Sequence, residues 1–234
     1  MDLQLFCLPF AGGSKYSYNY YLDSAPDFIE MIPLDLPGRG SRVREKLLKD
    51  VPSMVNDIFY QIEDKLYRPY AIYGHSMGGL LGYLLTKAII KRQLPPPLHL
   101  FVTGRGGPSV KNEEPPYHTL PYDEFILKLK EMQGSPEQIL NDSPSMEFFE
   151  PIIRADFCSL ANFEYESSEP FDVPITCMFG NDEKVTRDEA MAWQLETTAK
   201  VNIQEFPGEH FFIFQHGREV LGIIETSLVS ALRT

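Results

Sequence analysis

The chain has 234 residues, which suffices for one domain with a sizeable core and is short for two. Its formal net charge of −12 argues against general binding to nucleic acids or anionic membranes, because both require a basic surface. No secretion signal is expected, since Met1 and Asp2 lack a basic start and Pro9 interrupts the apolar residues that follow. No apolar run is long enough to cross a bilayer.

The cysteines indicate a reducing compartment. Cys7, Cys158 and Cys177 are odd in number and widely spaced, which is typical of buried, reduced thiols in a cytoplasmic protein. No group of His, Cys and Asp residues has metal-ligand spacing, and neither the P-loop nor the dinucleotide fingerprint is present. We therefore expect a cytoplasmic protein without a bound metal or cofactor.

Short apolar runs alternate with segments of helical periodicity along most of the chain. In chain order the pattern predicts a strand at 3–8, a strand at 28–34, a helix at 51–66, a strand at 70–73, a helix at 76–92, strands at 98–103 and 174–179, a helix at 188–198, a strand at 201–206 and a helix at 215–232. Continuous apolar strands separated by helices indicate an α/β fold whose mostly parallel sheet is covered by helices on both faces.

One long segment, residues 108–170, interrupts this alternation. It contains helical patterns at 125–132, 136–140 and 144–160 and no convincing strand. The segment leaves the sheet at Gly104 and rejoins it near Val173, so both of its ends lie at the sheet edge where ligands bind in α/β proteins. We expect a helical lid over that edge; the alternative is a helical hairpin packed on the side of the sheet.

A nucleophile motif stands where the strand at 70–73 passes into a helix. Gly74-His75-Ser76-Met77-Gly78 has the form G-x-S-x-G, with a strand before it and a helix after it. In this context the serine lies on a sharp turn, its hydroxyl exposed above the sheet and close to the positive end of the helix. Ser76 is therefore the candidate nucleophile.

A serine nucleophile requires a base, which is usually a histidine held by a carboxylate. In α/β enzymes that carry this motif between a strand and a helix, the three residues follow one another along the chain in the order Ser, then Asp or Glu, then His. His210 follows the last predicted strand in a turn and is the candidate base, whereas His216 begins the last helix. His75 is expected to point into the sheet packing.

The candidate acid is Asp182, which directly follows the strand at 174–179. Glu183 is the alternative if the turn has a different register. Asp188 fits the role of a helix cap better.

The reaction also needs backbone donors for the oxyanion. One is expected to be the N–H of Met77, the residue after the nucleophile, and the other the N–H of Ala11 in the glycine-rich loop after the first strand.

These segments resemble the type II thioesterases, external editing enzymes of non-ribosomal peptide and polyketide synthases that have the α/β-hydrolase fold. The resemblance covers nearly the whole chain. It is carried by Leu8-Pro9-Phe10-Ala11-Gly12-Gly13, Leu36-Pro37-Gly38-Arg39-Gly40-Ser41-Arg42, Gly74-His75-Ser76-Met77-Gly78-Gly79, Thr103-Gly104-Arg105-Gly106-Gly107-Pro108, Leu120-Pro121 with Phe125, Gly134-Ser135-Pro136 with Ile139-Leu140, Arg154-Ala155-Asp156-Phe157, Gly180-x-Asp182 and Gly208-x-His210-Phe211. The resemblance implies one α/β-hydrolase domain over residues 1–234, with 108–170 as the lid.

The resemblance implies hydrolysis of acyl thioesters on the phosphopantetheine arm of acyl or peptidyl carrier proteins through an acyl-serine intermediate. We expect a monomer whose partners are these carriers. Apolar lid residues are expected to line an acyl slot, although such residues often form helix core instead; they are Phe125, Leu129, Met132, Phe148, Phe149 and Phe157. Alternative functions are a medium-chain fatty acyl-carrier thioesterase, a carboxylesterase and a carrier-binding protein without catalysis.

Overall fold

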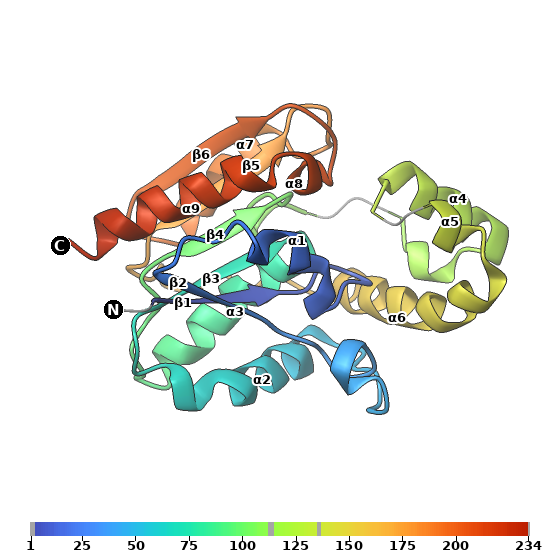
Figure 1. Ribbon diagram of the computed structural model, residues 1–234, viewed down its shortest axis with the longest axis horizontal. Helices are drawn as coiled ribbons and strands as arrows, with labels where there is room; N and C mark the ends of the chain where they lie inside the picture. The colour runs from blue at the N-terminus through green and yellow to red at the C-terminus, as the bar shows by residue number, and fades with distance from the viewer. Residues whose placement is uncertain (1–2, 112–114, 135–136, 234) are drawn as a thin grey trace.

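The apolar runs of the sequence form a six-stranded sheet in which every neighbouring pair of strands is parallel (Figure 1). The structure, a computed structural model, describes residues 3–111, 115–134 and 137–233. The sheet has the order β2-β1-β3-β4-β5-β6. Its strands are β1 (Leu3–Leu8), β2 (Ile29–Pro33), β3 (Tyr70–His75), β4 (Leu100–Thr103), β5 (Ile175–Gly180) and β6 (Val201–Phe206). The expected parallel sheet is confirmed.

Helices connect the strands, and all of them except the short helices at 19–22 and 212–215 correspond to helical patterns in the sequence. They are α1 (Asn19–Leu22), α2 (Val51–Ile62), α3 (Met77–Lys91), α4 (Tyr122–Met132), α5 (Glu137–Leu140), α6 (Ser143–Ala161), α7 (Arg187–Met191), α8 (Phe212–Gln215) and α9 (Gly217–Ala231). The helix expected at 188–198 is shorter, because α7 continues as a 3₁₀ turn at Ala192–Leu195. Ser135 and Pro136, which belong to the expected lid segment, lie outside the described residues.

The sheet is covered on both faces, which explains why its strands read as continuous apolar runs. Helices α2, α3 and α7 lie on one face and α1, α8 and α9 on the other (Figure 1). Within β3, Ile72 packs into the first apolar cluster and its neighbours Ala71 and Tyr73 pack into the second. This alternation fixes the register of β3 and hence the position of Ser76 at its end.

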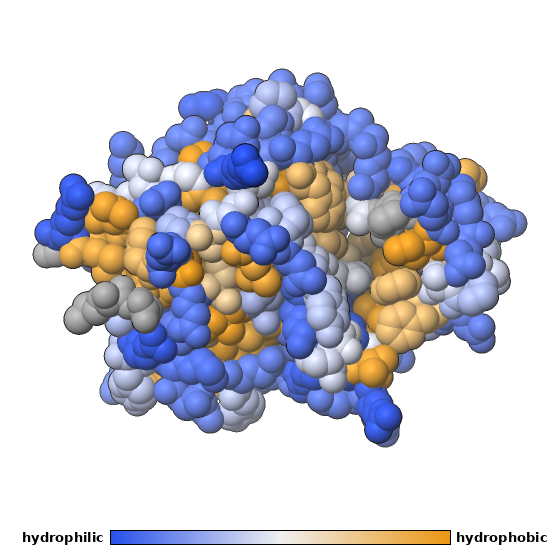
Figure 2. Space-filling model, in the orientation of Figure 1, coloured by the Kyte–Doolittle hydropathy of each residue, from blue (hydrophilic) through white to orange (hydrophobic). Residues whose placement is uncertain are grey.

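Helices α4, α5 and α6 form a lobe beyond the ends of the strands, and we call these three helices the helical lobe (Figure 1). The lobe has an apolar cluster of its own, formed by Phe125, Ile126, Leu129, Leu140, Met146 and Ile153. Figure 2 shows apolar surface in the hollow between the lobe and the sheet. Among the described residues, no helix combines the length and hydropathy that a membrane crossing requires.

Candidate active site

Ser76 occupies a strained turn between β3 and α3. Its backbone angles are φ 52° and ψ −113°, a conformation that non-glycine residues rarely adopt. The turn also brings backbone segments very close together: a Cβ on Gly74 would lie 2.1 Å from the carbonyl oxygen of Gly78, and one on Gly78 would lie 2.4 Å from that of Leu8. Both glycines are therefore required by space, and the turn has the form expected of a nucleophile elbow.

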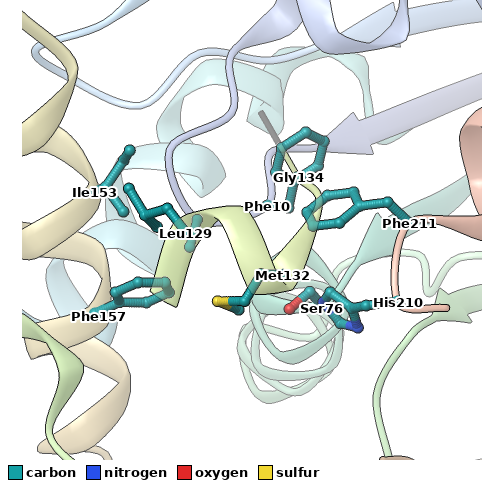
Figure 3. A pocket seen from close by; sticks show the side chains of 10 residues that line it. Phe10, Ser76, Leu129, Met132, Gly134, Ile153, Phe157, His210 and Phe211 are labelled. Carbon is teal, nitrogen blue, oxygen red and sulfur yellow. The ribbon is translucent and has the colours of Figure 1, made fainter. Parts of the chain in front are cut away.

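His210 and Ser76 line the same pocket, and their side chains lie close together in the view of Figure 3. On its other side, the Nδ1 atom of His210 lies 2.7 Å from Oε2 of Glu183. A carboxylate accepts hydrogen bonds, so in the neutral form of the imidazole this contact favours the tautomer whose proton is on Nδ1 and whose Nε2 is an acceptor. In this tautomer the ring can accept a proton from the serine.

The carboxylate that holds His210 is that of Glu183 and not that of Asp182. The side chain of Asp182 is exposed, whereas that of Glu183 is only 2% exposed. The reason is the register of the turn after β5: the Asp182 N–H donates to the carbonyl of Gly208, and the Gly180 N–H donates to Oε1 of Glu183. These bonds direct Glu183 inward and Asp182 toward solvent, which corrects the position expected for Asp182 and favours the alternative.

His75 is buried directly beneath the candidate base. Its Nδ1 atom lies 3.0 Å from the Thr103 hydroxyl, and its ring centre is 4.7 Å from that of His210. Burial lowers the pKa of His75 well below its usual value, and the neighbouring His210 lowers this pKa further. His75 therefore stays neutral. It is buried, but it packs against the His210 ring, a contact that the sequence analysis did not predict. His216 makes its nearest acidic contact with Glu219, one turn along α9.

The loop after β1 and the start of α3 are the two segments in which the sequence predicts oxyanion donors. In the loop after β1, the N–H of Gly12 donates to Oδ2 of Asp156 and that of Gly13 to the carbonyl of Phe10. Both are thus engaged, while Ala11 itself lines the pocket. Met77 is the first residue of α3, and the first N–H groups of a helix have no acceptor within it. The N–H groups of Ala11 and Met77 stay the predicted oxyanion donors.

An apolar pocket extends from Ser76 into the helical lobe (Figure 3). It comprises about 410 Å³ of space free of protein atoms, part of which is open to solvent. Its lining residues are Phe10, Ala11, Ser76, Leu129, Met132, Gly134, Ile153, Phe157, His210 and Phe211. A narrow apolar chamber that ends at a nucleophile suits the alkyl part of an acyl group.

The six apolar residues expected to form an acyl slot divide between pocket and packing. Leu129, Met132 and Phe157 line the pocket. Phe125 is fully buried in the core of the lobe, and Phe148 is 43% exposed with its ring against Phe149. These three residues do not line the pocket.

Sequence reasoning missed four lining residues, Phe10, Gly134, Ile153 and Phe211. Phe10 and Phe211 could have been found from their positions beside Ala11 and His210. For Ile153 the sequence offers no signal beyond helical spacing.

Comparison with known proteins agrees with this site. The thioesterase domain family matches residues 3–228. The gramicidin S biosynthesis protein GrsT of Aneurinibacillus migulanus is 35% identical, covering 94% of this chain and 86% of that protein. The human medium-chain S-acyl fatty acid synthase thioesterase is 27% identical over 93% of this chain and 83% of its own length.

Solved structures show the same fold. ClbQ from the colibactin NRPS/PKS pathway superimposes with a TM-score of 0.93 at 30% identity, covering 99% of this chain and 98% of that one. The type II thioesterase BorB from the borrelidin cluster gives 0.90 at 30% identity, with 97% and 93% covered. A family match over nearly the whole chain, together with the elbow at Ser76, shows that the chain belongs to the thioesterase domain family and is a thioester hydrolase with the α/β-hydrolase fold.

Proposed function

We propose that this thioesterase removes acyl groups from the phosphopantetheine arms of carrier proteins, as an editing enzyme of a non-ribosomal peptide or polyketide synthase. The observation that carries the proposal is the Ser76, His210 and Glu183 arrangement at the mouth of an apolar pocket. Similarity to GrsT, ClbQ and BorB supports the biosynthetic setting. The three free cysteines fit a reducing, cytoplasmic location.

The proposed reaction has two steps. His210 takes the proton of Ser76 through Nε2 while the serine oxygen attacks the thioester carbonyl carbon, and Glu183 stabilises the resulting imidazolium. The N–H groups of Met77 and Ala11 hold the oxyanion. The C–S bond breaks, the pantetheine sulfur receives the proton from His210, and the acyl group remains on Ser76.

In the second step His210 deprotonates a water molecule that attacks the acyl-serine ester. A tetrahedral oxyanion forms again at the same two N–H groups, the ester C–O bond breaks, and the proton returns to the Ser76 oxygen. The products are a free carboxylic acid and the regenerated enzyme. All of these steps use protein groups and water alone.

We also propose that the helical lobe acts as the lid of the pocket. Its contact with the catalytic side is close: a Cβ on Gly134, in the loop after α4, would lie 2.3 Å from the ring of Phe211, the neighbour of His210. Because Leu129 and Met132 of α4 and Phe157 of α6 line the pocket, any movement of the lobe changes the space left for the acyl chain.

Bulk at Met132 should shorten the acyl chain that the enzyme accepts. For Met132→Phe we expect the ratio of kcat/KM for octanoyl over acetyl thioesters to fall about tenfold or more, because a few methylene groups lose their space. Leu127→Phe is the matched control, since Leu127 lies on the same helix and is 61% exposed. An unchanged octanoyl-to-acetyl ratio in Met132→Phe would contradict a pocket that binds the chain.

The proposed function is tested by presenting one acyl group on a phosphopantetheinylated carrier protein, on coenzyme A and on a simple alcohol. We expect kcat/KM to be about tenfold higher or more for the carrier, since contacts worth about 1.4 kcal/mol suffice for that difference. Faster turnover of the alcohol ester than of both thioesters would identify a carboxylesterase instead.

A second candidate function is release of medium-chain fatty acids, favoured by the similarity to the human medium-chain thioesterase. The same carrier assay separates the two functions when the acyl length is varied. Editing predicts rapid cleavage of acetyl and propionyl groups, which occupy misprimed carriers. A marked preference for octanoyl and decanoyl groups would support the second function.

A further inference from the structure

A buried ion pair connects the helical lobe to the body of the enzyme. Arg39, in the loop after β2, donates from two nitrogens to both carboxylate oxygens of Asp156 on α6, at 2.5 and 2.8 Å. The side chains are 2% and 0% exposed. A forked, two-bond contact of this kind holds both groups in one orientation.

Asp156 also binds the loop that carries the oxyanion donor. Its Oδ2 atom accepts the N–H of Gly12 at 2.8 Å, so this single oxygen joins Arg39 and the residue next to Ala11. Arg39 approaches the same loop through the carbonyl of Gly13, at 3.4 Å. The Ala11–Gly12 peptide, which directly follows the peptide that carries the Ala11 N–H, is thus held by Asp156.

The same helix contributes to the acyl pocket. Ile153 and Phe157, on either side of Asp156 in α6, line the pocket beyond Ser76. The position of α6 therefore bears on both the acyl chamber and the oxyanion loop.

We infer that Asp156, oriented by Arg39, is a positioning residue that sets the oxyanion donor of the enzyme. This inference rests on the proposed function, because it takes Ala11 as an oxyanion donor. Asp156 acts through Gly12 and touches no reacting atom. Because the oxyanion forms in the transition state, we expect Asp156 to affect kcat and to leave KM nearly unchanged.

Stability alone does not explain the pair. Buried ion pairs are often no more stabilising than apolar residues of similar volume, because desolvation of both charges opposes their attraction. What the pair adds here is a fixed acceptor for the Gly12 N–H, and this contribution can be measured separately from the charges.

Two double variants isolate that acceptor. Arg39→Met/Asp156→Asn and Arg39→Met/Asp156→Ala both lack the ion pair, but only the first retains a side-chain oxygen for the Gly12 N–H. We expect kcat per active site to be about 10- to 100-fold lower in the Ala variant than in the Asn variant, with KM within about threefold, since loss of one oxyanion donor costs about 10²- to 10³-fold. Active sites are counted by complete labelling of Ser76 with a fluorophosphonate, and folding is checked by thermal unfolding.

Asp57→Asn is the matched control. Asp57 on α2 also accepts two bonds from one arginine, Arg42, at 2.6 and 2.8 Å, but Asp57 does not contact the oxyanion loop. We expect its kcat per active site to remain at the wild-type value.

Equal kcat per active site in the two double variants would overturn the inference. If neither folds, the variant Arg39→Lys decides, because it keeps the charge and loses the two-bond contact with Asp156. A fall in kcat of about 3- to 10-fold at unchanged KM supports the positioning role, and a wild-type kcat overturns it.

Failure of the proposed function is distinguishable, since it would appear as absent thioesterase activity in the wild type. The variants can then still be compared on an oxygen ester, whose cleavage forms the same kind of oxyanion.

Discussion

Ser76→Ala is expected to lower kcat for hydrolysis of an acyl thioester by at least about 10⁴-fold, because no acyl-enzyme can form and the base then has no nucleophile to activate. The residual rate should reflect only the remaining oxyanion donors and the pocket. Steady-state turnover of an acyl-carrier substrate provides the measurement, and denaturing mass spectrometry after brief mixing should detect an acyl adduct in the wild type alone.

Ser227→Ala serves as the control for this variant. Ser227 is also partly buried and donates to the carbonyl of Ile223 within α9, away from the pocket. We expect its turnover to match that of the wild type. Near-normal turnover in Ser76→Ala, or an acyl adduct that persists on it, would exclude the acyl-serine mechanism.

Glu183→Gln is expected to lower kcat by about 10⁴-fold, the effect that loss of the orienting acid has in Ser-His-Asp enzymes. The reason is the tautomer. Oε1 of Glu183 accepts the Gly180 N–H, so the glutamine carbonyl is expected to take this position and its NH₂ group to face Nδ1 of His210. A donor at that place favours an unprotonated Nδ1 and a protonated Nε2, which cannot accept the proton of Ser76.

Asp182→Asn is the decisive control, because the two carboxylates are adjacent in sequence and only one contacts the base. We expect this change at an exposed side chain to alter kcat less than about threefold. Its backbone bond to Gly208 is unaffected by the substitution. The assignment of Glu183 fails if Asp182→Asn loses activity and Glu183→Gln retains it.

Much of the fold could be predicted from local patterns. The strands at 3–8 and 201–206 have the predicted bounds, because each is followed directly by a proline, Pro9 or Pro207, and prolines end strands. The elbow could be predicted as well. The two glycines around Ser76 are required because backbone atoms approach them closely, and these atoms belong to the motif itself or to the end of the adjacent strand β1.

Local patterns could not predict that Glu183, and not Asp182, contacts His210. Asp182 and Glu183 have the same charge and follow the same strand, so composition and spacing treat them alike. The turn after β5 gives the two side chains different directions because it is hydrogen-bonded to the turn after β6. The Asn181 side chain accepts the N–H of Gly208, and the Asp182 N–H donates to the Gly208 carbonyl. These residues are more than 25 positions apart, and only the packed sheet brings the two turns together.

The amino-acid order thus predicted the parallel sheet and offered a candidate nucleophile and a candidate base, because short-range periodicity and turn chemistry encode each of these features. Only the tertiary structure decided which carboxylate contacts His210, which apolar residues of the lobe line the pocket, and that Arg39, Asp156 and Gly12 share one buried contact. Contacts between segments distant in sequence depend on how whole elements pack, and no local pattern records that packing.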